Sequence, residues 1–187
     1  MITEAKFKYA LKEMMKTHDL EEINVTALCA KCSCHRQTFY YHFQDIYDLI
    51  ATIFLTEDLG KFNTAKTIRE ALRAFVIYAK DNFAFLRQTY NSAARDLTDD
   101  FLFSKFNFKI LNILMADESV TLLVEAKRNV SRRFASALSD EFGYCFKDQS
   151  LAPDRFVKKM QKYIDNAIAV LLPAYIELAK KEENKHD

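Results

Sequence analysis

The chain between residues 24 and 43 has the pattern of two short helices joined by a tight turn. The first helix is predicted from residue 24 or 25 to residue 32, because apolar side chains recur there at the three- and four-residue intervals of an amphipathic helix. The second is predicted from about His35 to Phe43, where Phe39 and Phe43 are spaced to pack against the first. The segment therefore predicts a helix-turn-helix motif. The apolar positions of its first helix are Val25, Leu28, Cys29 and Cys32.

The second helix of this motif leaves one face rich in hydrogen-bond donors and flat rings. Such side chains suit phosphates and the edges of bases in DNA. Arginine pairs with guanine and glutamine with adenine, so Arg36 and Gln37 are candidates for reading a base sequence. The alternative is that both are ordinary surface residues, and Tyr40 is equally compatible with a core position. The predicted DNA-binding face comprises Arg36, Gln37, Thr38, Tyr40, Tyr41 and His42.

Three of the four cysteines lie within the motif, at positions 29, 32 and 34, and the fourth is Cys145. One interpretation is a thiol or metal sensor formed by Cys29, Cys32 and Cys34. The other is that they fill buried positions, where a free cysteine packs as a small apolar residue. Zinc sites usually pair one C-x-x-C with further ligands downstream, and the sequence contains no such partner. We therefore favour buried thiols and expect no metal site and no cofactor.

The rest of the chain predicts helices throughout. Only two glycines and two prolines occur, and β-branched residues do not alternate in runs. Thr3 is expected to cap a first helix, Asn24 the second and Asp45 a fourth, with Asp48 in capping-box position. The buried stripe expected for the fourth helix is Ile46, Leu49, Ile50, Ile53 and Phe54. The predicted fold class is all-α. The expected domains are a helix-turn-helix domain over 1–50, a connecting fourth helix over 46–60, and a helical regulatory and dimerisation domain over 61–187.

The second half of the chain carries further helix-start signals. Thr67 and Glu70 form a capping box, Thr98 and Asp117 are each expected to open a helix, and Pro153 begins the last one. The last helix is apolar nearly all round between residues 164 and 178, so it needs cover on more than one side. We expect a homodimer formed through helices near 118–142 and 154–182, with Gly143 ending the first and Pro173 bending the second.

A phenylalanine-rich segment, residues 101–108, has two interpretations. It lines a cavity for a small-molecule effector, or it is ordinary hydrophobic core. Phenylalanines on all sides of one helix need several neighbours, and an internal pocket supplies them. The candidate pocket residues are Tyr78, Phe83, Arg87, Tyr90, Phe101, Phe103, Phe106, Asn107 and Met115.

Several classes of protein are disfavoured. No phosphate-binding glycine loop, G-x-S-x-G or H-E-x-x-H motif occurs, so we expect no enzyme. The longest apolar run, 167–172, is too short to span a bilayer, and no signal segment opens the chain, so we expect a cytoplasmic protein without membrane contact. The net charge is only +1, and residues 1–50, the predicted DNA-binding head of the chain, are slightly acidic. A single head should therefore bind DNA weakly.

The helix-turn-helix segment resembles the DNA-binding domain of TetR-family transcriptional regulators. The resemblance rests on Thr38-Phe39-Tyr40-Tyr41-His42-Phe43 and on the residues that lead to Leu49. Arg36 to Tyr40 and Gln44-Asp-Ile-Tyr-Asp-Leu49 are most similar to the branch that contains dihydroxyacetone-kinase regulators. Beyond residue 60 the resemblance is architectural only. It implies a bacterial regulator with a recognition helix at 35–43.

The resemblance assigns roles to the residues of the motif. Arg36, Gln37, Thr38 and Tyr41 would face the major groove, Tyr40 and His42 would touch the DNA backbone, and His35 would sit at the N-cap of the recognition helix. Two positions depart from the family pattern. Ser33 replaces the usual turn glycine, and Ile46 replaces a lysine that commonly contacts phosphate. The cysteines at 29 and 32 stand where the family has buried alanines, which supports the packing interpretation.

The predicted partner is a palindromic double-stranded DNA operator, with one recognition helix of the dimer in each half-site. A small-molecule effector would bind the C-terminal domain and change operator affinity, as in a ligand-responsive repressor. The alternative is a regulator or adaptor of the same fold that is controlled by a partner protein. The near-neutral head and the missing lysine at position 46 motivate that alternative, as does the resemblance, whose branch includes an activator controlled by a protein co-regulator.

Overall fold

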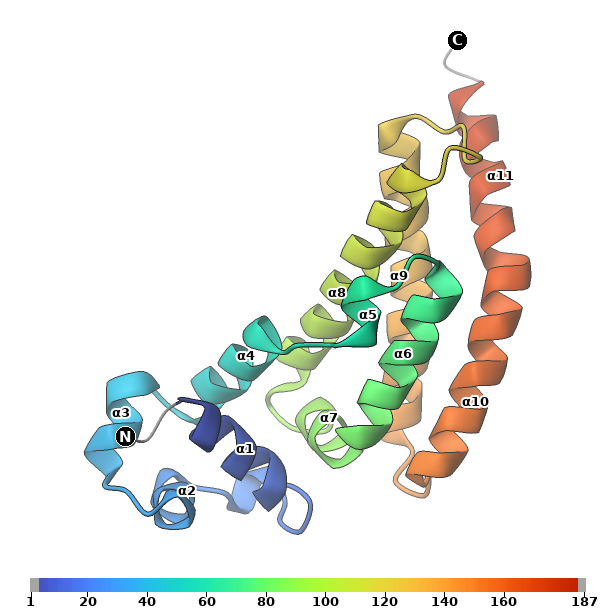
Figure 1. Ribbon diagram of the computed structural model, residues 1–187. Coiled ribbons are helices and arrows are strands. Elements are labelled where there is room, and N and C mark those ends of the chain that lie inside the picture. The colour runs from blue at the N-terminus through green and yellow to red at the C-terminus, as the bar shows by residue number, and fades with distance from the viewer. Residues whose placement is uncertain (1–3, 185–187) are drawn as a thin grey trace. The chain divides into compact units, whose positions relative to one another are not determined.

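The computed structural model describes residues 4–184, and every regular element in that range is helical (Figure 1). The predicted all-α class is therefore confirmed, whereas Thr3, the expected first cap, lies outside the described residues. No helix within this range has both the length and the apolar character that a membrane crossing requires. The elements are α1 (Glu4–Met14), η1 (Leu20–Glu22), α2 (Val25–Cys32), α3 (Arg36–His42), α4 (Ile46–Thr56), α5 (Lys61–Thr64), α6 (Ile68–Asp81), α7 (Phe83–Tyr90), α8 (Arg95–Ala116), α9 (Val124–Lys147), α10 (Pro153–Asn166), the π-helix η2 (Ala167–Leu171) and α11 (Leu172–Glu183).

Contacts divide the chain into two compact units. The first comprises Met1–Glu57 and Asn82–Phe101, and the second comprises Asp58–Asp81 and Leu102–Asp187. The first unit therefore recruits α7 and the start of α8, which the sequence-based division near residue 60 assigns to the other domain. Aromatic packing is the physical reason, because the ring of Phe54 in α4 stacks on Phe101 at 4.6 Å and lies 5.3 Å from Phe85.

The core of the first unit forms where α1, α2, α3 and α4 meet. Phe7 in α1 packs edge-on against Phe39 of α3 at 5.4 Å and against Phe43 at 6.0 Å. The stripe predicted for α4 is buried as expected. Its members are Ile46, Leu49, Ile50, Ile53 and Phe54.

The second unit is a helical bundle in which α6 packs on α10 and α11 packs on α9. A cluster of phenylalanines joins these helices. Phe106 of α8 lies 4.6 Å from Phe75 of α6 and 5.2 Å from Phe142 of α9, and Phe142 lies 5.7 Å from Phe156 of α10. The core interpretation of the phenylalanine-rich segment is therefore correct for Phe106, which is fully buried.

Two predicted helix starts are wrong. Thr98 lies inside α8, which begins at Arg95, and its buried hydroxyl donates to the hydroxyl of Thr89 at 3.0 Å instead of capping a helix. Asp117 follows the end of α8, and its carboxylate accepts bonds from the backbone and side chain of Ser119 in a turn. The helix expected near 118–142 therefore begins only at Val124.

Two further differences concern helix ends and a connection. Gly143 is buried inside α9, which continues to Lys147, so it does not end the helix. The polar segment from Gly60 to Lys66, next to the domain boundary expected at residue 60, contains the short helix α5 with Phe62 buried against Phe75 at 5.5 Å. In both places tertiary packing overrides the local signal.

The last helix, expected over 154–182, is interrupted by a π turn at η2. There the backbone N–H of Leu172 donates to the carbonyl of Ala167, five residues earlier. Pro173 supplies the cause, because its ring crowds the carbonyl of residue 169 and it has no N–H to donate. The bend predicted at Pro173 thus takes the form of a widened turn immediately before it.

Two phenylalanines of α8 allow a matched test of this core. Phe106 is 0% exposed and Phe108 is 68% exposed, although they are two residues apart on one helix. Phe106→Ala should lower the free energy of unfolding by about 3–5 kcal/mol through lost burial and a cavity. Phe108→Ala should change it by less than about 1 kcal/mol. Urea unfolding followed by circular dichroism measures both, and equal losses would contradict the packing described here.

Candidate DNA-binding surface

The helix-turn-helix is built by local bonds that the sequence specifies. The side-chain oxygen of Asn24 accepts from the backbone N–H of Ala27 at 3.0 Å and caps α2. At the other end Ser33 adopts the left-handed conformation, with φ of 54°, and the N–H of Cys34 returns to the carbonyl of Cys29 at 3.0 Å. Serine thus occupies the turn position that is usually glycine, and its left-handed backbone conformation is strained.

α3 is oriented by its apolar side. Phe39 is completely buried and Phe43 is 3% exposed, and both contact Phe7 of α1. Residues two positions away from Phe39 along a helix point to the opposite side. Gln37 and Tyr41 accordingly lie on the outer face, where Tyr41 is 85% exposed.

The structure places most of the predicted DNA-binding residues at the surface. His35, Arg36, Gln37 and Tyr41 are exposed, Tyr40 is half exposed, and Thr38 and His42 are partly buried. A core position for Tyr40 is therefore excluded. His35 occupies the N-cap position but makes no capping bond with its side chain.

An arginine–tyrosine pair orders one edge of α3. The guanidinium of Arg36 donates to the hydroxyl of Tyr40 at 3.3 Å and lies 5.8 Å from its ring centre. This bond, together with electrostatic attraction to the Tyr40 oxygen, raises the pKa of Arg36. The pair arises from the four-residue spacing of Arg36 and Tyr40, a signal that the sequence interpretation did not use.

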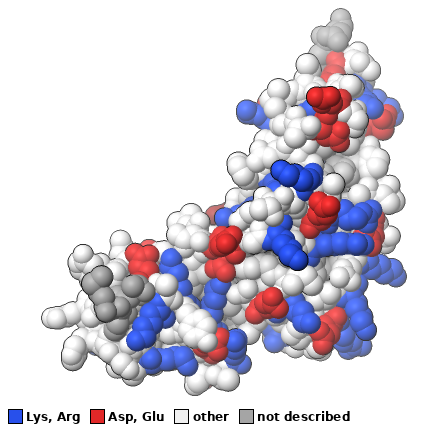
Figure 2. All heavy atoms as spheres, in the orientation of Figure 1, with Lys and Arg blue, Asp and Glu red and all other residues white. Residues whose placement is uncertain are grey.

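The amino end of α4 differs from what a phosphate-binding helix start needs. Ile46, at the position of the expected lysine, is 8% exposed and packs into the core. Asp45 accepts from the N–H of Asp48 at 2.8 Å, which confirms the predicted cap, and Asp48 accepts at 2.9 Å from the N–H of Gln44, one residue before the N-cap. Two carboxylates therefore occupy this helix end. Figure 2 shows basic and acidic side chains interspersed over the face in view.

The cysteines of the motif behave as packing groups. Cys29 and Cys32 are buried, and their thiols point to the carbonyls of His35 and Lys6 at 3.8 and 3.9 Å. Burial raises the pKa of Cys29 from 9.0 to about 11, with a further contribution from Cys34, and burial also raises the pKa of Cys32. Both thiols are thus held in the protonated form, which neither ligates metal nor acts as a nucleophile. Within residues 4–184, no three His, Cys, Asp or Glu side chains are grouped so that they could hold a metal ion.

The predicted effector-pocket residues fall into both units. Phe83, Arg87, Tyr90 and Phe101 belong to the first, and the others belong to the second. Phe106 is core, Phe103 and Asn107 are partly buried, and Met115 is 47% exposed. Asn107 and Tyr78 have separate surroundings: Asn107 accepts a bond from Ser131 at 2.9 Å, and the ring of Tyr78 lies 5.5 Å from Phe75.

Comparison with known proteins gives the class of fold. No protein-family model matches the chain, and no curated protein matches it. Solved structures do match. The dihydroxyacetone kinase operon activator DhaS superimposes with a TM-score of 0.69 at 19% identity, covering 95% of this chain and 97% of that one.

Two further structures have the same architecture. A putative transcriptional regulator from Pseudomonas aeruginosa PAO1 has a TM-score of 0.56 at 15% identity, with 92% and 93% of the two chains covered. The TetR family repressor AlkX from Dietzia sp. strain DQ12-45-1b has a TM-score of 0.55 at 12% identity, with 94% and 96% covered. The chain therefore has the fold of a TetR-type regulator, as its resemblance to that family predicted.

Ser33 offers a direct test of turn strain. A non-glycine residue in the left-handed conformation destabilises the folded state by about 1–2 kcal/mol. Replacing it with glycine removes this strain, but the extra conformational freedom of glycine in the unfolded chain offsets about 0.4–1 kcal/mol of the gain. Ser33→Gly should therefore raise the free energy of unfolding by roughly 0.5–1 kcal/mol. Ser33→Ala keeps the strained backbone angle and serves as the control, with a change of less than about 0.5 kcal/mol. If urea titration gives equal stabilities for the two variants, the turn is not strained.

The raised pKa of Cys29 predicts slow alkylation. A thiol with a pKa of about 11 instead of 9.0 has about 100-fold less thiolate at pH 8. Iodoacetamide should modify Cys29 at least about 100-fold more slowly in the folded than in the unfolded protein, with the rate rising about tenfold per pH unit towards pH 11. Peptide mass spectrometry measures each cysteine separately. Rapid modification of Cys29 at pH 7 would instead support a thiol sensor.

Proposed function

We propose that this protein is a sequence-specific DNA-binding transcriptional regulator whose recognition helix is α3. The observation that carries the proposal is the two-sided character of this helix. Two buried phenylalanines fix its backbone, and its outer face presents Arg36, Gln37 and Tyr41. A helix of this kind enters the major groove, where a bidentate arginine or glutamine discriminates between bases.

The proposal includes a homodimer formed through α9 and the α10–η2–α11 segment. Val170 is 65% exposed and Leu178 is 43% exposed on that segment, so a second copy would cover apolar surface. Two heads would also double the phosphate contacts, which the slightly acidic residues 1–50 need. The operator would then be a palindrome whose half-sites lie about 34 Å, one helical turn, apart.

Regulation would follow from a two-state equilibrium of the dimer. An effector that binds the C-terminal helical unit more tightly in one state shifts the population towards that state and changes operator affinity. The structural neighbours support a regulatory role, since their names include an operon activator and a repressor. One of these neighbours is named as an activator and the other as a repressor, so the proposal does not say whether this protein is an activator or a repressor.

A second candidate is control by a partner protein in place of a small molecule. The observation that favours it is on α8, where Phe108 is 68% and Met115 is 47% exposed. Exposed side chains of this size are the kind that anchor protein interfaces. Phe108→Ser would then abolish the response to the partner but leave operator binding intact.

Selection of DNA from a random library, followed by fluorescence anisotropy on the selected site, tests the main proposal. The expected site contains two inverted half-sites. Gln37→Ala and Arg36→Ala should each weaken binding by about 1–3 kcal/mol, or roughly 5- to 150-fold, and relax preference at one position of each half-site.

Tyr9→Ala provides the control, because Tyr9 is 67% exposed in the same unit but lies on the side of α1 opposite Phe7. Its affinity should match that of the unchanged protein. A library that yields no enriched sequence, or variants with unaltered preference at every position, would contradict the proposal that α3 reads bases.

A further inference from the structure

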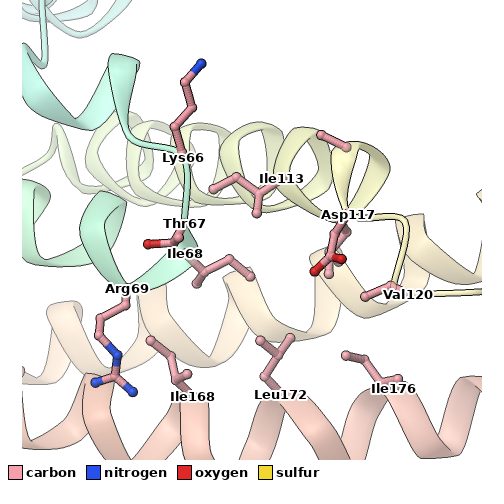
Figure 3. A pocket seen from close by; sticks show the side chains of 12 residues that line it. Lys66, Thr67, Ile68, Arg69, Ile113, Asp117, Val120, Ile168, Leu172 and Ile176 are labelled. Carbon is pink, nitrogen blue, oxygen red and sulfur yellow. The ribbon is translucent and has the colours of Figure 1, made fainter.

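The second unit contains an open pocket at the end of α8 that lies away from the aromatic core. Its volume is about 430 Å³, within the range of small-molecule sites. The walls come from the start of α6, the carboxyl end of α8 with the turn after it, and the segment around η2. Figure 3 shows side chains from these elements facing one another across the space. None of the residues predicted to bind an effector lines it.

The lining is aliphatic and branched, and several of its side chains are only partly buried. Ile168 in η2 and Leu172 and Ile176 in α11 follow one another at four-residue intervals along one wall. Aliphatic surface left partly in water gains free energy when an apolar ligand covers it. The remaining large aliphatic side chains of the pocket are Ile68, Ile113, Leu114 and Val120.

One of the three charged groups at the pocket points into it. The carboxylate of Asp117 is directed towards the aliphatic walls, whereas the side chain of Lys66 extends away from them (Figure 3). Arg69 forms an ion pair with Asp165, which Arg73 also contacts at 3.2 Å. The charge available to a ligand is therefore negative.

The turn after α8 holds Asp117 in place. Its Oδ1 accepts from the N–H of Ser119 at 2.9 Å and from the hydroxyl of Ser119 at 2.6 Å. These bonds also keep the pKa of the Asp117 carboxyl below its ordinary value, so the group is ionised at neutral pH. The other oxygen, Oδ2, has no hydrogen-bond partner among the contacts within residues 4–184.

We propose that this pocket is the effector site of the second unit and that it binds an apolar amine, with the ammonium group on Asp117 and the hydrocarbon part against the isoleucines. The inference rests on the proposed regulatory function. It deepens that function by naming the chemical class of the ligand. A carboxylic acid would meet like charge at Asp117, and an uncharged ligand would gain no charge attraction from this exposed carboxylate.

The pocket also offers a route from ligand to regulation. One wall is the π turn and the first turns of α11, and the opposite wall belongs to α6 and α8. A ligand that contacts both walls favours one separation between them. The π turn, widened before Pro173, is the place where this helix departs from regular geometry, and helices commonly bend at such turns and at prolines. Binding would thus be transmitted to the segment proposed to form the dimer.

Isothermal titration with n-butylamine, n-hexylamine and n-octylamine tests the site, with n-octanoate and n-octanol as probes of head-group charge. Affinity should rise about fourfold with each methylene group. Octylamine should bind more tightly than octanol, and octanoate most weakly. Asp117→Asn should weaken octylamine roughly three- to tenfold and leave octanol unchanged.

The chain offers a matched control in Asp148. Its Oδ1 accepts from the N–H and hydroxyl of Ser150 at 2.9 and 2.6 Å, the same turn as at Asp117 but outside the pocket. Asp148→Asn should therefore leave amine binding unchanged. A second variant, Ala116→Phe, fills the pocket and should weaken every probe. The inference would be overturned if the two aspartate variants had equal effects on amine binding. It would also be overturned if octanoate bound more tightly than octylamine, or if no probe bound.

DNA binding separates this inference from the proposed function. On the selected DNA site, octylamine should change the affinity of the unchanged protein and of Asp148→Asn, and have a smaller effect on Asp117→Asn. Specific DNA binding with no amine binding would overturn the inference and leave the proposed function standing. Amine binding that depends on Asp117, in a protein with no DNA preference, would overturn the proposed function and leave the amine site.

Discussion

The burial of Phe39 beneath α3 is the interaction on which the candidate DNA-binding surface depends. A helix of seven residues is too short to be stable in isolation, so its conformation must come from tertiary packing. Phe39 supplies that packing through edge-on contact with Phe7 at 5.4 Å. Once its ring is directed inward, helical geometry directs Gln37 and Tyr41 outward. The exposure of these two side chains on the outer face is therefore a consequence of core packing and needs no further contact.

Charge places a second constraint on this head. The amino end of α4 carries Asp45 and Asp48 and buries Ile46, so its dipole is already satisfied by the protein's own carboxylates. A phosphate at that position would meet like charge. In the proposed complex, affinity for DNA would then come mainly from α3 and from the presence of two DNA-binding domains, so the proposed dimerisation would be a condition of tight binding.

Sequence patterns predicted the features whose partners are local. The Asn24 cap, the Thr67–Glu70 capping box and the buried stripe of α4 depend on residues within one or two turns, and all of them form. Thr98 and Asp117 were misinterpreted because hydroxyls and carboxylates also bond outside helix caps. The helical period alone places Phe106 and Phe108 on different sides of α8. Which side is buried depends on contacts with Phe75 and Phe142, which are distant in the sequence. The effector residues were predicted mainly from aromatic side chains, whereas the pocket proposed here as an effector site is lined mainly by aliphatic ones.

The irregular end of the bundle follows from a single residue. Pro173 cannot donate a backbone bond and crowds the preceding turn, so the helix widens over Ala167–Leu171 and does not pack as a regular rod. Closer packing would bury Ile168 and Leu172 against α6 and α8, but they remain partly exposed on one wall of the pocket. The apolar surface left uncovered there, with the carboxylate of Asp117 at its edge, is stabilised by any ligand that supplies both a hydrocarbon chain and a positive charge. Because the same turn belongs to the segment proposed for dimerisation, ligand recognition and dimer geometry would share one structural element.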